Sequence, residues 1–135
     1  MNILFFLHPK SEVKFLYGDS TVRQGLEKMK ANGYTAIPVI SRDGKYIGTV
    51  SEGDFLWYII NESDRSMKGQ EKTLVTSIMN QTRNPEVRID STMEDLINRA
   101  MDQNFVPVVD DRGVFVGIIT RRDIIKHLVS KGESA

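Results

Sequence analysis

The stretch PVISRDGKYIGTVSEGD at residues 38–54 recurs as PVVDDRGVFVGIITRRD at residues 107–123. The two copies align without a gap and lie 69 positions apart. Each begins with Pro and two aliphatic residues, passes through two Gly residues, and ends with Ser or Thr three positions before Asp. Because an internal repeat of this kind corresponds to a repeated structural unit, the chain is predicted to contain two similar subdomains.

The composition is that of an ordinary globular protein. Of the 135 residues, 40% are hydrophobic and 27% are charged. A repeat of about 60 residues would be only marginally stable alone, and two such repeats could share a core. Basic and acidic side chains balance at 18 each, which predicts no general attraction to nucleic acid or to an anionic membrane. The absence of cysteine excludes disulfides and thiolate sites and fits a cytoplasmic protein.

The N-terminal run 3–7 is apolar but short. It falls well below the ~18 apolar residues that a membrane span requires. It also lacks the basic flank and the length of a signal peptide. We therefore predict a short helix or strand that packs on the core and ends near Pro9.

Hydrophobic periodicity predicts the order strand, helix, strand, strand, helix in each repeat. In the first repeat, Thr21 and Gln24 form a predicted capping box at the start of a helix that closes at Gly33. The other expected elements are a strand within 10–18, strands at 36–40 and 46–50, and a helix at 55–60.

In the second repeat, Ser91 and Glu94 form the predicted capping box. The other expected elements are strands at 87–89, 105–109 and 114–119 and a helix at 124–129. The predicted domains span residues 8–62 and 73–131, with a polar linker at 61–72. The fold class is α/β (α+β), and two units with one apolar sheet face each are expected to pack with pseudo-two-fold symmetry.

The repeats differ in one connection. Seventeen positions separate Thr21 from Pro38, but only fifteen separate Thr92 from Pro107. The second repeat therefore lacks two residues where its helix meets its next strand, and it has no counterpart of Gly33.

Ser51-x-x-Asp54 and Thr120-x-x-Asp123 both stand where a strand ends and a helix begins. One interpretation is purely structural, because Ser or Thr at the N-cap with an acid three positions later satisfies free amide donors. The other is functional. The helix N-terminus favours a phosphate, and the two oxygens of the Asp side chain can accept hydrogen bonds from the vicinal hydroxyls of a ribose. Gly48 and Gly117 would let a backbone or a ligand approach closely.

With these motifs in view, the two copies resemble CBS (cystathionine-β-synthase-type) domains over roughly residues 8–131. In the first copy the resemblance rests on Ile37-Pro38-Val39, Gly44, Gly48-Thr49-Val50 and the Ser51–Asp54 motif. In the second copy it rests on Val106-Pro107-Val108, Gly113, Gly117-Ile118-Ile119 and the Thr120–Asp123 motif.

The resemblance implies a tandem pair of β-α-β-β-α repeats, a Bateman module, that binds adenosine-containing ligands in clefts between its domains and forms a homodimer. It implies that Asp54 and Asp123 hold the ribose hydroxyls and that Ser51 and Thr120 lie near phosphate or ribose. It places the adenine beside the Pro-containing strands, at Ala36, Ile37, Pro38, Phe105, Val106 and Pro107. It also places the opening segment of each domain at its cleft, with Lys10 and Val13 in the first and Thr82 and Val87 in the second.

The two sites are expected to differ in charge. Glu52 in the first motif disfavours a phosphate, whereas Arg121 and Arg122 in the second suit one. We therefore expect phosphate charge to favour the second motif, although the shorter connection changes its adenine side.

The residues indicate no enzyme. The two histidines, His8 and His127, stand near opposite ends of the chain without partners typical of a triad or a metal site, and each is expected to be a surface or packing residue. Trp57 and Tyr58 belong either to the core or to a dimer face.

The main hypothesis is a stand-alone regulatory module that requires no cofactor, binds a nucleotide of the AMP, ADP or ATP class, and signals to a separate effector protein. The alternatives are a dimerisation or scaffold module without a ligand, or a sensor of a cyclic dinucleotide or of S-adenosylmethionine. None of these hypotheses involves nucleic acid or a membrane.

Overall fold

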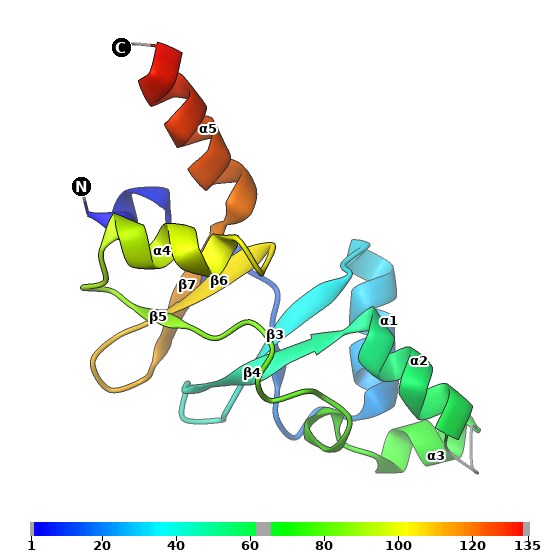
Figure 1. The fold of residues 1–135 in the computed structure, drawn as a ribbon. Coiled ribbons are helices and arrows are strands. Elements are labelled where there is room, and N and C mark those ends of the chain that lie inside the picture. The colour runs from blue at the N-terminus through cyan, green and yellow to red at the C-terminus, as the bar shows by residue number, and fades with distance from the viewer. Residues whose placement is uncertain (1, 62–65, 134–135) are drawn as a thin grey trace. The chain divides into compact units, whose positions relative to one another are not determined.

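Residues 2–61 and 66–133 are described by the computed structural model, and the chain divides into two units (Figure 1). The first-repeat unit is Lys14–Arg83. The second-repeat unit combines the residues that precede Lys14 with those that follow Arg83. Each unit therefore contains one copy of the repeated stretch. The first-repeat unit also includes the start of the range predicted for the second repeat, up to Arg83, and the second-repeat unit also includes the start of the range predicted for the first repeat, up to Val13.

The first-repeat unit is built on a three-stranded sheet of order β2-β3-β4. β2 runs parallel to β3, and β3 runs antiparallel to β4. The elements in chain order are β2 (Leu16–Tyr17), α1 (Val22–Asn32), β3 (Ala36–Ile40), β4 (Tyr46–Ser51), α2 (Glu52–Asn61), α3 (Met67–Lys72) and the 3-10 helix η3 (Val75–Ser77). The predicted order of strand, helix, strand, strand and helix is confirmed, although the strand expected within 10–18 contains only Leu16 and Tyr17.

Local chemistry explains the ends of α1. Thr21 caps the helix in a reciprocal box with Gln24, as predicted, so two otherwise unpaired backbone donors are satisfied. Gly33 closes the helix with φ of 67°, a left-handed conformation that glycine adopts without steric cost. The linker predicted at 61–72 lies partly outside the described residues. Its last six residues form α3, capped by Ser66, so this part of the segment is helical.

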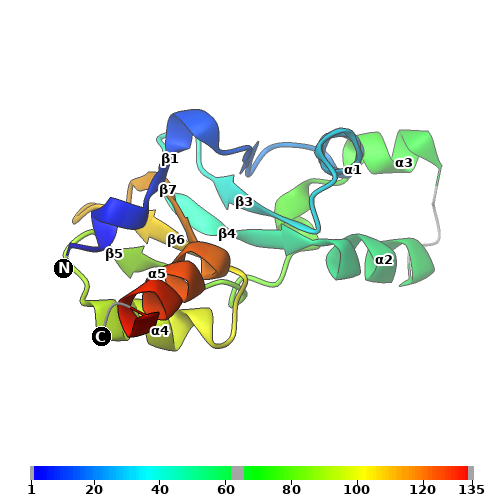
Figure 2. The same cartoon turned by 90° about the horizontal axis from the view of Figure 1, so that it is seen from above.

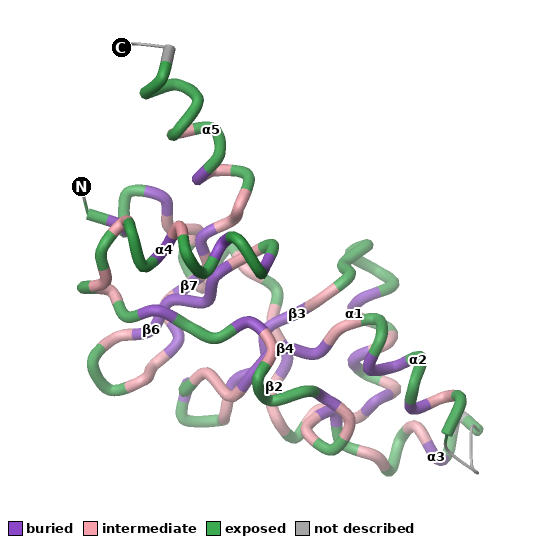
Figure 3. The backbone as a smooth tube through the Cα atoms, in the orientation of Figure 1, coloured by how far each residue is buried: buried purple, intermediate pink, exposed green. Residues whose placement is uncertain are grey.

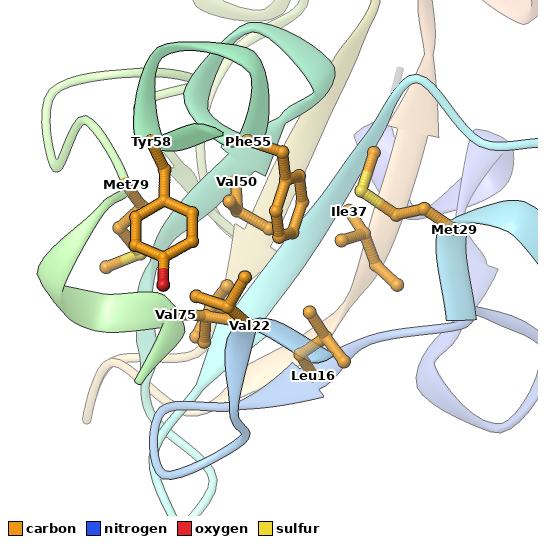
Figure 4. Packing of buried hydrophobic residues seen from close by; sticks show 10 residues of the cluster. Leu16, Val22, Met29, Ile37, Val50, Phe55, Tyr58, Val75 and Met79 are labelled. Atoms are coloured by element: carbon orange, nitrogen blue, oxygen red, sulfur yellow. The ribbon is translucent and has the colours of Figure 1, made fainter. Parts of the chain in front are cut away.

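The core of the first-repeat unit draws on its three strands, on α1 and α2, and on the segment that follows α3 (Figure 4). Val22 and Met29 of α1 meet Phe55 and Tyr58 of α2 over the sheet. The segment after α3 completes this core, because Val75 is fully buried within it. A segment that follows the first repeat in the sequence is therefore part of the first-repeat unit.

The second-repeat unit is built on a four-stranded sheet of order β1-β7-β6-β5 (Figure 2). β5 runs parallel to β6, whereas β7 runs antiparallel to both of its neighbours, β6 and β1. The elements in chain order are η1 (Ile3–Phe6), β1 (His8–Pro9), η2 (Lys10–Glu12), β5 (Val87–Arg88), α4 (Met93–Ala100), β6 (Phe105–Val109), β7 (Phe115–Thr120) and α5 (Arg121–Glu133). The predicted α/β (α+β) class is thus confirmed in both units.

The N-terminal segment belongs to the second-repeat core. Ile3 and Phe6 of η1 are buried against residues that include Leu96, Val106 and Ile119, which confirms the prediction of a short helix packed on the core. β6 and β7 are largely buried, whereas most of α5 is exposed (Figure 3).

The predicted cap of α4 is wrong by one residue. Thr92, not Ser91, is the N-cap, and its partner in the capping box is Asp95, not Glu94. The Ser91 hydroxyl instead accepts a hydrogen bond from the Arg88 amide. Ser91 and Thr92 are both followed by an acid three positions later, so the local pattern does not distinguish the two registers.

Among residues 2–61 and 66–133, no helix has the length and apolar character needed to cross a lipid bilayer. Within the same ranges, no group of three or more His, Asp or Glu side chains could hold a metal ion.

Candidate functional site

In both units the repeated motif stands at the junction of a strand and a helix. Ser51 is the last residue of β4, and α2 begins at Glu52; Thr120 is the last residue of β7, and α5 begins at Arg121. The antiparallel ladders place Ala36 opposite Ser51 and Phe105 opposite Thr120. The start of each Pro-containing strand, expected to face an adenine, therefore lies beside the residues expected to face phosphate and ribose.

The same ladders position the remaining residues of these strands. Ile37 pairs with Val50 and Pro38 with Thr49 in the first-repeat unit. Val106 pairs with Ile119 and Pro107 with Ile118 in the second-repeat unit. The side chains of Ile37 and Val106 are fully buried, so these two residues can offer a ligand only their main-chain groups.

In the first motif, Ser51 and Asp54 cap α2 reciprocally. The Ser51 amide donates to Asp54 Oδ2 at 2.9 Å, and the Asp54 amide donates to Ser51 Oγ at 3.3 Å. Asp54 Oδ2 also accepts a hydrogen bond from the Arg83 guanidinium. The Asp54 side chain is only 8% exposed, so its carboxylate is buried. The same carboxylate caps the helix and forms an ion pair with Arg83.

In the second motif, Thr120 caps α5 by accepting a hydrogen bond from the Asp123 amide at 3.2 Å. Asp123 Oδ2 lies 2.6 Å from His8 Nε2, and the two side chains are 32% and 44% exposed. The hydrogen bond from His8 lowers the pKa of Asp123 from its ordinary value, against the opposing effect of burial. The second carboxylate is therefore more open to solvent than the first.

The sequence analysis did not predict the basic side chains that bind the two aspartates. Arg83 lies in the range predicted for the second repeat yet binds Asp54 of the first, and His8 lies in the range predicted for the first repeat yet binds Asp123 of the second. His8 lies at the surface, as predicted, with its side chain 44% exposed, but its contact with Asp123 was not predicted. His127 does pack, because its ring meets the Phe6 ring edge-on at 5.0 Å between centroids. The partners are 29 and 115 positions from their aspartates, so no local spacing indicates them.

Three of the four residues expected in the opening segments lie in the unit other than the expected one. Lys10 and Val13 belong to the second-repeat unit, whereas Thr82 belongs to the first-repeat unit. Thr82 donates from its amide and its hydroxyl to Asn80 Oδ1, at 3.0 and 2.7 Å, in the turn that leads to Arg83. Val87 stays in the second-repeat unit, where it pairs with Val108 and its side chain is buried.

The start of β6, the strand expected to meet an adenine in the second-repeat unit, is contacted by side chains of the same unit. The Phe105 carbonyl already accepts hydrogen bonds from the side chains of Asn84 and Gln103, both at 3.0 Å. A second Gln103 bond, to the Pro85 carbonyl at 3.1 Å, holds the same buried amide in place. In the second-repeat unit, side chains of the chain itself therefore use one of the main-chain acceptors expected to meet a base.

The charged residues of the two motifs also differ in their surroundings. Arg121 Nε donates to the Ala100 carbonyl at 2.7 Å, so part of its guanidinium satisfies the end of α4. Arg122 is exposed. Glu52 is also exposed and lines a pocket of about 290 Å³ between α1 and α2. The other lining residues of this pocket are Leu26, Met29, Lys30, Gly33, Tyr34 and Phe55.

The two motif glycines permit close contacts within their own units. A Cβ on Gly117 would lie 2.2 Å from the carbonyl oxygen of His8, because β1 runs against β7 at that point. A Cβ on Gly48 would lie 3.1 Å from the end of the Met79 side chain. The group that approaches Gly117 closely is a backbone carbonyl, and the group that approaches Gly48 is a flexible side chain.

Comparison with known proteins identifies related sequences and folds. The family model of the CBS domain matches residues 7–61 and 75–130 of the chain. An uncharacterized protein of Methanocaldococcus jannaschii is 26% identical over 144 residues, with 84% of each chain covered. The chloroplastic CBS domain-containing protein CBSX1 of Arabidopsis thaliana is 27% identical over 146 residues, which cover 90% of this chain and 61% of that protein. The crystal structure of CbpB in complex with c-di-AMP is similar with a TM-score of 0.87 at 25% identity, over 96% of this chain and 85% of that one.

Proposed function

The chain belongs to the CBS domain family, and from this premise we propose that it is a regulatory module that binds an adenosine-containing nucleotide at its two motifs. The module passes its binding state to an effector protein and catalyses no reaction of its own. The observation that carries the proposal is the strand register, which sets Ala36 beside Ser51 and Phe105 beside Thr120 at the N-terminus of a helix.

Each part of a nucleotide has a chemical counterpart at these junctions. Backbone N–H groups at the start of α2 and α5 favour a phosphate. The carboxylates of Asp54 and Asp123 are acceptors for the two hydroxyls of a ribose. Main-chain groups of β3 and β6 can hydrogen-bond the edge of an adenine. A ligand can then bias the module toward one arrangement, provided that it binds that arrangement more tightly than the others.

The nucleotide belongs either to the AMP, ADP and ATP class or to the cyclic dinucleotides. CbpB, which is similar over 96% of this chain, was crystallised with c-di-AMP, and this supports the second class. S-adenosylmethionine also carries an adenosine and is therefore a further candidate ligand. A scaffold that binds no nucleotide is the competing hypothesis, in which Ser51 and Thr120 serve only as helix caps.

A panel of adenosine ligands is expected to identify the nucleotide. At 100 times its dissociation constant, the correct ligand should stabilise the protein by about 2.7 kcal/mol and raise Tm by several degrees. The panel contains AMP, ADP, ATP, c-di-AMP and S-adenosylmethionine, with the guanosine counterparts as controls. Tm is measured by thermal shift, and affinity is then measured by calorimetry.

Asparagine variants assign the ligand to the motifs. We expect Asp123→Asn to weaken binding by tenfold or more, because a charged acceptor for the ribose hydroxyls is lost. Asp90→Asn is the matched control, since Asp90 is an exposed acid outside both motifs. If no ligand of the panel raises Tm, the scaffold hypothesis replaces this proposal. Loss of binding in Asp54→Asn alone would contradict the preference for the second motif.

We also propose that the protein is a homodimer formed through its exposed helices. Trp57 on α2 is 64% exposed, with Leu56 and Ile60 beside it on the same helix, whereas its neighbour Tyr58 is buried in the core. On α5, Ile125, Leu128 and Val129 are exposed in the same way. Large exposed apolar groups gathered on a helix are typical of a protein–protein interface.

The substitution Trp57→Glu is expected to produce a monomer, because it places a charge within that apolar face. Sedimentation velocity measures the change in mass. Met101→Glu is the control, since Met101 is exposed outside α2 and α5. A wild-type protein that sediments as a monomer, or a Trp57→Glu variant that stays dimeric, contradicts this assignment.

A further inference from the structure

The two motif aspartates are bound by basic side chains of different kinds. Asp54 is paired with the guanidinium of Arg83, and Asp123 is paired with the imidazole of His8. Arginine keeps its charge throughout the physiological pH range. Histidine is the side chain whose charge changes between about pH 5 and pH 8. The aspartate of the first motif therefore has an arginine partner, whose charge is permanent, whereas the aspartate of the second motif has a histidine partner.

A ribose must compete with these partners. His8 Nε2 lies 2.6 Å from Asp123 Oδ2, so a hydroxyl that binds the same oxygen has to share it with His8 or displace it. Protonated imidazole binds a carboxylate more strongly than neutral imidazole does, because the hydrogen bond is then reinforced by an ion pair. Both side chains of the pair are partly exposed, at 44% and 32%, so a solvent-borne ligand can reach them.

We propose that His8 makes ribose binding at the second motif depend on pH by competing for Asp123, whereas Arg83 makes binding at the first motif independent of pH. This inference rests on the proposed function, in which Asp123 and Asp54 receive the ribose. A ligand then binds the second motif more tightly as the pH rises and His8 loses its charge. The first motif, whose carboxylate is buried, shows no such response.

The proposed pH response is assigned to His8 because histidine is the side-chain type that changes charge near neutral pH. Asp123 also receives a hydrogen bond from the Thr120 hydroxyl and the field of Lys126 on α5. The other charged side chains on these elements are Lys10 and Glu12 of the 3-10 helix η2, which follows β1, and Arg122 of α5. Lysine, arginine and glutamate are not the side-chain types that change charge in this range, whereas histidine is. His127, the other histidine of the chain, faces the Phe6 ring.

The first experiment tests the pair without any ligand. In His8→Gln, the pKa of the Asp123 carboxyl is expected to rise, since the hydrogen bond from His8 is the largest effect that lowers it. The carboxyl is followed by NMR as a function of pH in the whole chain. His127→Gln is the matched control and should leave the Asp123 titration at its wild-type position. An unchanged Asp123 titration in His8→Gln overturns the proposal, whether or not a nucleotide binds.

The second experiment measures competition. The probe is adenosine, which carries both ribose hydroxyls but no phosphate that titrates in the same range. Its affinity for wild type and His127→Gln should be up to about fivefold greater at pH 8 than at pH 5.5, the range for a partly exposed ion pair. The affinity of His8→Gln should be the same at both pH values.

The outcomes separate the two claims. If His8→Gln keeps the wild-type pH dependence, or if wild type shows none, competition by His8 is excluded while nucleotide binding stands. If Asp123→Asn retains the pH dependence, the responsive site is not the second motif, and the proposal fails. If wild type binds no adenosine at either pH, the proposed function fails and the competition fails with it. The carboxyl titration still decides whether His8 binds Asp123.

Discussion

The substitution Gly117→Ala is expected to destabilise the second-repeat unit by about 3 kcal/mol, at the upper end of the cost of overpacking. The added Cβ would lie 2.2 Å from the His8 carbonyl oxygen, far inside the contact distance of the two atoms. The neighbour is backbone, and Pro9 pairs with Gly117 across the ladder between β1 and β7. The clash can therefore be relieved only if β1 moves away from the sheet.

Urea denaturation of the variant measures this cost. Gly132→Ala is the matched control, because Gly132 lies in α5 and a Cβ there meets no atom within 4 Å. Within a helix, that change should be neutral or stabilising by up to about 1 kcal/mol. A Gly117→Ala variant that unfolds at the wild-type urea concentration would show that β1 does not lie on β7 in solution.

A second effect of Gly117→Ala links the fold to the site. Displacement of β1 carries His8 away from Asp123, since His8 is one of the two residues of that strand. The pKa of Asp123 should then rise toward its ordinary value, because the hydrogen bond that lowers it is lost. The NMR titration used for His8→Gln measures this effect in the folded variant at low temperature.

Within each repeat, the sequence was sufficient to predict the fold. Local chemistry determines the alternation of strand and helix, the capping box of Thr21 and the left-handed turn at Gly33. These features depend on neighbouring residues, so they can be predicted from the sequence. The register of each hairpin follows from its turn, where Gly44 and Gly113 have positive φ. These are contacts between residues close in sequence, for which spacing is informative.

The exchange of segments between the repeats was not predictable in this way. Ile3 and Phe6 are apolar, and their pattern predicts burial in a core but does not say in which one. Val75 has the same ambiguity, although it completes the core of the first-repeat unit. Which core receives a segment depends on the path of the chain in space, and hydrophobic periodicity contains no information on that path.

The candidate site shows the same limit. The sequence indicated that Ser51 and Asp54 cap a helix or bind a nucleotide, and the structure shows the cap directly. The cation that completes each motif was not predicted, because Arg83 and His8 reach their aspartates only through the exchanged segments. An ion pair between residues that are distant in the sequence produces no periodic pattern from which it could be predicted.

The substitution Arg83→Ala is expected to destabilise the first-repeat unit by about 2 kcal/mol. It leaves the Asp54 carboxylate, which is 8% exposed, without the guanidinium that neutralises it. Removal of one partner from a fully buried ion pair costs about 3–5 kcal/mol. The cost is lower here because Arg83 is 31% exposed, so water can replace part of its interaction, and the Ser51 amide still donates to Asp54.

Two further variants make this prediction specific to the pair. Arg23→Ala is the matched control, because Arg23 forms a more exposed ion pair with Glu27 within α1, and its loss should cost at most about 0.5 kcal/mol. In the double variant Arg83→Ala with Asp54→Asn, the buried charge is absent as well, so part of the lost stability should return. Urea denaturation of the four proteins measures these differences. If Arg83→Ala costs no more than Arg23→Ala, then Asp54 is solvated in solution and open to a ribose, and the first motif would become the better candidate for the primary nucleotide site.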